Sequence, residues 1–167
     1  MCAQAAGANN YRLVAVWTTI GMWSIAIASI PVLISWGFAE PILLAVGFPP
    51  DESQLAGSFT KTYCLSLIPF VWYTVLQNAL QALGNAYPAL WINLSLVPVN
   101  VALNQVFIFG VPGHWDGLGF VGSPLATSVT RWLSLGLVAA YMVIWDGKHK
   151  KCFEAGLMSW LPEAFSS

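Results

Sequence analysis

Long apolar runs without charged side chains dominate the chain. No Asp, Glu, Lys or Arg occurs in residues 13–39 or 62–115, and only Arg131 interrupts residues 117–145. A helix that crosses a bilayer needs about 20 mostly apolar residues, so the first run holds one span and the second holds two. The turn-forming cluster at residues 83–88 (LGNAYP) divides the second run. The pattern predicts four transmembrane helices, at about 13–38, 62–83, 87–110 and 120–145.

The composition agrees with a membrane protein and excludes other classes. Of the 167 residues, 57% are hydrophobic and 8% are charged, and the mean hydropathy is +0.69. A soluble domain is about 25% charged. The net charge of −1 leaves no basic surface for nucleic acid, and the apolar content excludes intrinsic disorder. We therefore expect an all-α integral membrane protein whose surroundings are the lipid bilayer.

Residues that carry enzymatic or metal chemistry are sparse. Cys2, Cys64 and Cys152 lie far apart, and His114 stands near a single acid, Asp116. No nucleophile elbow, zinc-protease motif or phosphate-binding loop occurs. We expect no enzymatic activity, no catalytic residue, no cofactor and no metal site.

The segments outside the spans carry two further predictions. Pro50 followed by Asp51 and Glu52 is typical of the first turn of a helix, because acids stabilise its positive end. The second helix is therefore expected to begin near Asp51, before it enters lipid. Residues 146–167 are expected to form a cytoplasmic tail.

Basic residues in the short connections predict the orientation in the membrane. Four crossings place the N-terminus, the turn near residue 85 and the tail on one side. That side holds Arg12, Lys148, Lys150 and Lys151, whereas the other side holds only Lys61. Lys and Arg accumulate on the cytoplasmic side, so both termini are expected to be cytoplasmic.

Polar side chains within the third span form one stripe. At 100° per residue, Asn93, Asn100 and Asn104 fall within about 40° of arc. Pro98 interrupts the backbone hydrogen bonding of the same helix. Such a stripe lines a wet cavity or joins helices by hydrogen bonds, and the spacing fits both interpretations.

The second and fourth spans also carry polar residues, and Arg131 is the most costly of them. Gln77, Asn78 and Gln81 are further candidates for cavity lining. Thr127 shares a helical face with Arg131. A mid-span Arg is disfavoured by roughly 2.5–3.5 kcal/mol. Because the spans hold no acid, we expect its partner to be a carbonyl, water or a group outside this chain, and we favour a structural or cavity role over direct substrate binding.

Four motifs, in this order, resemble those of a known family. They are residues 2–8 (CAQAAGA), residues 40–56 (EPILL, then Gly47, Pro50 and LA), residues 76–88 (LQ, LQALG and the closing proline) and residues 118–128 (LGFVGSPLATS). Together they resemble the multidrug and toxic compound extrusion (MATE) family of secondary transporters, over roughly residues 2–145.

The resemblance implies a fold and a function. MATE transporters have twelve helices in two six-helix lobes, and rocking of the lobes gives alternating access. Influx of H⁺ or Na⁺ drives export of small organic compounds, often cationic, across the plasma membrane or an organelle membrane. On this resemblance residues 1–145 correspond to the end of helix two and helices three to six of the N-terminal lobe, and residues 146–167 to the tail or inter-lobe linker. The chain is then expected to be a fragment whose partner is the missing part of the same transporter.

The resemblance also implies site residues and leaves two alternatives. Asn100, Asn104 and Thr127 correspond to a cation site in the first lobe of one branch of the family. Asn104 stands where that branch has Asp, and an amide cannot carry a proton. A lipid-linked oligosaccharide flippase of the same superfamily is one alternative, disfavoured because Arg131 is the only intramembrane basic residue. A non-transporting membrane subunit or fragment is the other.

Overall fold

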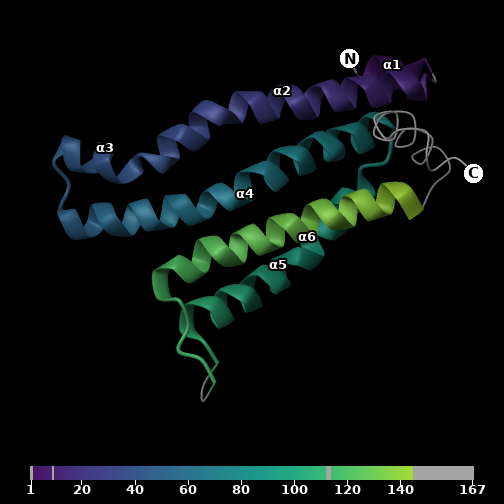
Figure 1. The fold of residues 1–167 in the computed structure, drawn as a ribbon. Coiled ribbons are helices and arrows are strands. Elements are labelled where there is room, and N and C mark those ends of the chain that lie inside the picture. Colours follow the sequence, from purple (N-terminus) through teal and green to yellow (C-terminus); the bar gives the residue numbers. More distant parts are fainter. Residues whose placement is uncertain (1, 9, 112–113, 145–167) are drawn as a thin grey trace, which may run out of the picture.

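The structure, a computed structural model, describes residues 2–8, 10–111 and 114–144, which fold into helices (Figure 1). In chain order the elements are α1 (Cys2–Gly7), α2 (Tyr11–Gly37), α3 (Ala39–Val46), α4 (Pro50–Ala82), α5 (Tyr87–Phe109), the 3-10 turn η1 (Gly119–Val121) and α6 (Gly122–Ile144). Four of these segments, namely α2, α4, α5 and η1 with α6, are long and apolar enough to cross a membrane. The predicted all-α membrane fold with four spans is confirmed. The predicted tail, residues 146–167, lies outside the described residues.

The four long helices are arranged in the order α2, α4, α6, α5 (Figure 1). α4 packs on both α2 and α6, and α6 packs on both α4 and α5. The turn between α4 and α5 and the end of α6 lie at one end of the bundle, while α3 and the α5–α6 connection lie at the other (Figure 1). The chain therefore crosses the bundle four times in alternating directions.

α4 begins well before the segment predicted to lie in lipid. Pro50 occupies the first turn together with Asp51 and Glu52, which confirms the helix start expected near Asp51. The 33 residues of α4 extend about 50 Å, whereas the hydrocarbon core of a bilayer is about 30 Å thick. α4 is therefore longer than the hydrocarbon core is thick, as expected for a helix that begins before it enters lipid.

Two short helices, α1 and α3, lie outside the predicted spans. α3 ends at Gly47, which takes the left-handed conformation (φ 98°) that closes a helix C-terminus. α1 contains all but the last residue of the CAQAAGA motif, and its Ala5 packs with Val14 and Ala15 of α2. The small side chains of Ala5 and Ala15 let α1 and α2 approach closely, a contact that hydropathy alone does not predict.

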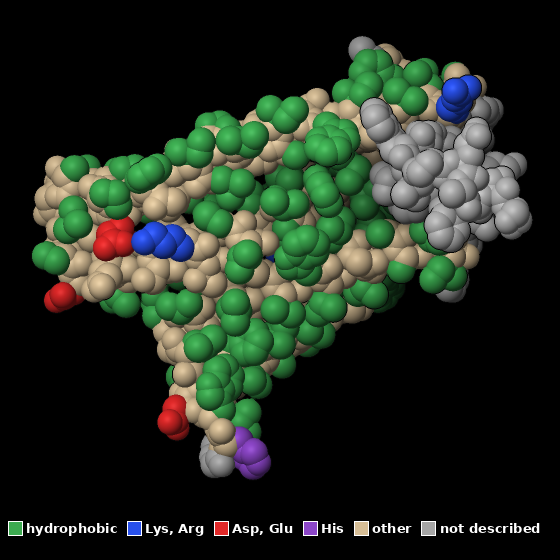
Figure 2. All heavy atoms as spheres, in the orientation of Figure 1, with side chains coloured by type: hydrophobic (Ala, Val, Ile, Leu, Met, Phe, Trp, Pro, Cys, Tyr) green, Lys and Arg blue, Asp and Glu red, His purple; other side chains and the backbone are tan. Residues whose placement is uncertain are grey.

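The main core lies between α4 and α6. Tyr73, Leu76 and Leu80 of α4 pack with Val138 and Met142 of α6. Many other large apolar side chains remain exposed, and Figure 2 shows them along the length of the bundle, with charged side chains mostly near its ends. Exposed apolar side chains of this kind suit contact with lipid or with further membrane helices, where packing and hydrogen bonds hold helices together.

Glycines make the connection between α5 and α6 compact. Gly110 and Gly117 both have φ of 78°, a region that favours glycine. A Cβ on Gly117 would lie 2.7 Å from the backbone nitrogen of Gly110, and a Cβ on Gly110 would collide with the Trp115 carbonyl. Leu118 N donates to Phe107 O at 2.8 Å, so α6 begins directly against the end of α5.

Candidate functional site

A groove of about 260 Å³ lies between α5 and α6. α5 contributes Asn93, Leu96, Val97, Asn100 and Val101, and α6 contributes Thr127, Thr130, Arg131 and Ser134. Spacings of three and four residues keep each set on one helical face. The structure therefore brings together four residues singled out in the sequence, Asn93, Asn100, Thr127 and Arg131.

Asn100 forms the polar link across this groove. Its Nδ2 donates to Thr130 Oγ1 at 3.0 Å, from α5 to α6. Asn104 Nδ2 in turn donates to the backbone carbonyl of Asn100 at 2.9 Å and to its Oδ1 at 3.0 Å. Asn100 thus lines the groove and also joins the two helices, whereas Asn104 is not among the lining residues.

The hydroxyl groups on α6 donate to their own helix. Thr127 Oγ1 donates to the Ser123 carbonyl at 3.1 Å, Thr130 Oγ1 to Ala126 at 2.9 Å and Ser134 Oγ to Thr130 at 2.9 Å. Each hydroxyl has one proton to donate. These groups therefore face the groove as acceptors only.

Arg131 has an aromatic partner that the sequence analysis did not predict. Its Cζ lies 4.3 Å from the centre of the Phe70 ring on α4, a cation–π contact. Within the described ranges Arg131 forms neither an ion pair nor a hydrogen bond. We expected a carbonyl, water or an external group as the partner of Arg131, and Phe70 was not among these. Which residues of α4 face α6 depends on tertiary packing, so the sequence did not identify Phe70.

The electrostatic character of the groove follows from its lining. Arg131 is the one formally charged side chain among the lining residues. In the described part of the chain, no group of three or more His, Cys, Asp or Glu is placed to hold a metal ion. The field in the groove is therefore that of a single cation among neutral dipoles.

Three buried polar atoms of α4 lack hydrogen-bond partners in the described structure. They are Ser53 Oγ, Trp72 Nε1 and the Tyr73 hydroxyl, and Tyr73 is only 3% exposed. The sequence analysis did not single out Tyr73 as a polar group, since an aromatic residue in an apolar run is usually core.

The amides of α4 lie elsewhere. Gln77 is half-buried, Asn78 and Gln81 are exposed, and none of the three lines the groove between α5 and α6. Their predicted role in a cavity remains a prediction.

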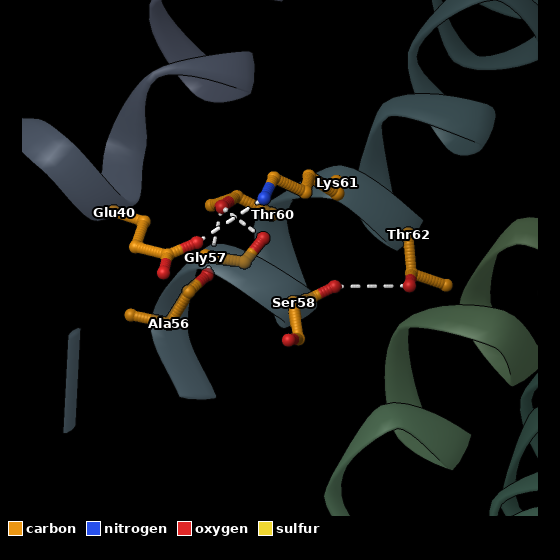
Figure 3. Close-up of polar contacts among 7 residues, drawn as sticks. All are labelled: Glu40, Ala56, Gly57, Ser58, Thr60, Lys61 and Thr62. Atoms are coloured by element: carbon orange, nitrogen blue, oxygen red, sulfur yellow. Dashed lines mark hydrogen bonds and ion pairs between the residues drawn. The ribbon is translucent and has the colours of Figure 1, made fainter. Parts of the chain in front are cut away.

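An ion pair joins α3 to α4 beyond the groove, at the α3 end of the bundle. Lys61 Nζ lies 3.2 Å from Glu40 Oε2. Figure 3 shows Gly57 beneath the Glu40 side chain, and Thr60 Oγ1 donating to the Ala56 carbonyl at 2.7 Å. Gly57 has no side chain, and this lets α3 approach α4 closely enough for the pair to form.

Comparison with known proteins shows which family and which relatives the sequence of this chain resembles. Residues 1–106 match the profile of the MatE family. "Probable multidrug resistance protein NorM" of Rhodopseudomonas palustris is 35% identical over 135 residues, which are 79% of this chain and 28% of that protein. "Protein DETOXIFICATION 16" of Arabidopsis thaliana is 30% identical over 142 residues, 85% of this chain and 28% of that protein.

A third relative shows the same coverage. "Probable multidrug resistance protein NorM" of Bacillus subtilis is 34% identical over 131 residues, which are 78% of this chain and 29% of that protein. The chain therefore spans less than a third of the length of each of these relatives.

Proposed function

This chain belongs to the MatE family, and on that premise we propose that it forms part of a transporter that exports small organic compounds by alternating access. The observation that carries the proposal is the groove between α5 and α6, where Asn100 and Arg131 place polar groups near the middle of membrane-crossing helices. Polar side chains at such depth are costly unless they line a pathway or find partners. The relatives named as multidrug resistance proteins support the same class of cargo.

The groove also bears on the partner and on the coupling ion. A polar groove open toward lipid is unfavourable, so we propose that the remainder of such a transporter covers it. Asn100 and Thr127 place oxygen atoms at the groove, and Asn104 contacts Asn100 from outside its lining. Arg131 stands one turn after Thr127 and opposes a second positive charge. We propose that binding of the driving H⁺ or Na⁺ depends chiefly on groups outside this groove.

A transport assay tests the proposed function. The chain, and the longer polypeptide containing it where the transcript encodes one, is reconstituted in liposomes with an imposed H⁺ or Na⁺ gradient. We expect gradient-dependent movement of at least one fluorescent organic compound, abolished by an ionophore that collapses the gradient. If no compound of a panel of cations and anions moves under either gradient, the protein is not an exporter of this kind.

Orientation is proposed from charge and tested by labelling. We propose that the turn at Asn85 is cytoplasmic and that the start of α4 at Asp51 faces the opposite side, because basic residues accumulate at the Asn85 end. In intact cells, with native cysteines replaced, a membrane-impermeant thiol reagent should label Asp51→Cys and spare Asn85→Cys. The reverse result would invert the topology.

A further inference from the structure

Most hydrogen-bond donors that line the groove already donate to groups within the protein. The hydroxyl protons of Thr127, Thr130 and Ser134 are donated to backbone carbonyls of α6. Asn100 donates to Thr130. The donors that remain for a ligand are those of Arg131 and one N–H of the Asn93 amide, which carries two.

The contact with Phe70 leaves the N–H donors at the edge of the Arg131 guanidinium unused. A guanidinium is planar, carries five N–H donors in its plane and stacks by its face on aromatic rings. The centre of the Phe70 ring lies 4.3 Å from the guanidinium carbon. This contact covers one face of the guanidinium and uses none of its N–H donors. The edge donors suit an oxyanion, which accepts two parallel hydrogen bonds from such a fork.

We propose that this groove binds the oxyanion group of an amphipathic organic anion, a carboxylate, sulfonate or phosphate, with Arg131 and Asn93 as donors and an apolar wall on α5 for the body. Leu96, Val97 and Val101 form that wall. The proposal rests on the proposed transport function and names a substrate class for it.

Charge and space both favour an anion here. The groove is lined by one cation and no carboxylate, so Coulomb interaction attracts an anion and repels a cation. The volume of about 260 Å³ lies just below the range of about 300–1,000 Å³ for whole ligand sites, so it suits the charged end of a larger molecule.

Equilibrium dialysis with a matched pair of probes tests the proposal. The protein in nanodiscs of phosphatidylcholine is dialysed at pH 7.4 against naphthalene-2-carboxylate and naphthalene-2-carboxamide, with empty nanodiscs subtracted. The probes share a ring and differ in charge. We expect the carboxylate to bind at least about tenfold more tightly, as hydrogen bonds to charged groups allow. Equal affinities, or no binding of either probe, would overturn the proposal.

Variants assign the preference to Arg131. Arg131→Gln should bring the ratio of the two affinities to about one, and Arg131→Lys should leave an intermediate ratio, because Lys keeps the charge without the fork. Arg12→Gln removes an exposed cation at the start of α2 and is the matched control, expected to leave the ratio unchanged. If Arg131→Gln retains the wild-type ratio, Arg131 is not the anion site.

A second variant protects the test against misfolding of Arg131→Gln. Thr127→Glu places a carboxylate one turn before Arg131, the helical spacing and order that favour an ion pair. This internal carboxylate should occupy Arg131 and abolish the preference although the arginine is still present. A preference that survives in Thr127→Glu would contradict the proposal.

Two further comparisons complete the test. One distinguishes a free organic anion from a lipid phosphate, and the other distinguishes the binding site from the proposed transport function. Adding phosphatidylglycerol to the nanodiscs should leave the ratio unchanged if a free organic anion is the ligand, and suppress it if a lipid phosphate takes the same oxyanion site. Transport without an Arg131-dependent preference would refute this inference and leave the proposed function intact. An Arg131-dependent preference without gradient-driven transport would refute the proposed function and leave the binding site.

Discussion

Gly57 of α4 lies directly against Glu40 of α3, so close that a Cβ added to Gly57 would stand 2.7 Å from the Cβ of Glu40. This contact allows α3 to dock on the N-terminal part of α4. It also brings Glu40 within 3.2 Å of Lys61. The docking of α3 therefore depends on a missing side chain as much as on a charge pair.

Replacing Gly57 with Ala should undock α3. The new methyl group must displace Glu40, and overpacking of this kind typically costs about 1–3 kcal/mol. Thermal stability of the detergent-solubilised protein, followed by size-exclusion chromatography, measures the effect. Gly136→Ala is the matched control, because nothing lies within 4 Å of a Cβ there. Equal melting temperatures for the two variants would show that Gly57 does not limit the approach of α3.

Removing the ion pair should have a smaller effect that depends on salt. Lys61 is 57% exposed at its side chain and Glu40 33%, and exposed pairs contribute about 0–1 kcal/mol. We expect Glu40→Gln to lower stability slightly at low ionic strength and not at all near 1 M salt, where the Debye length is about 3 Å. The Gly57→Ala loss should persist in high salt, since it is steric. A salt-independent loss in Glu40→Gln would assign the role of Glu40 to packing.

Sequence reasoning predicted the spans because hydropathy and charge act over whole segments. Arg131, Asn100 and Thr127 could be placed on helix faces from spacing alone, and the structure brings them to one groove. The partner of Arg131 could not be predicted, because Phe70 lies on another helix and the facing of two helices depends on side-chain packing between them. Nor was α3 predicted, since its eight residues are too few for periodicity to distinguish a helix from a loop.

The link between Asn100 and Thr130 should contribute measurably to the packing of α5 on α6. A double-mutant cycle of Asn100→Ala and Thr130→Val, with unfolding in mixed micelles, should give a coupling energy of about 0.6 kcal/mol and no more than about 1.7 kcal/mol, the range for hydrogen bonds between membrane helices. Thr74→Val is the control, because Thr74 Oγ1 donates to Phe70 of its own helix at 2.9 Å and should not couple to Asn100. A coupling of zero for Asn100 and Thr130 would mean that the asparagine only lines the groove.

Water should reach Asn93 and not its neighbour Leu94. Both residues are exposed, but Asn93 lines the groove, whereas Leu94 points about 100° around the helix from it and is 58% exposed, as a lipid-facing residue would be. With Cys2, Cys64 and Cys152 replaced by Ser, a water-soluble thiol reagent should label Asn93→Cys at least several-fold faster than Leu94→Cys in membranes. Equal rates would place the asparagine stripe in lipid. A wet groove could then no longer explain why a helix accepts Asn93, Asn100 and Asn104 on one face.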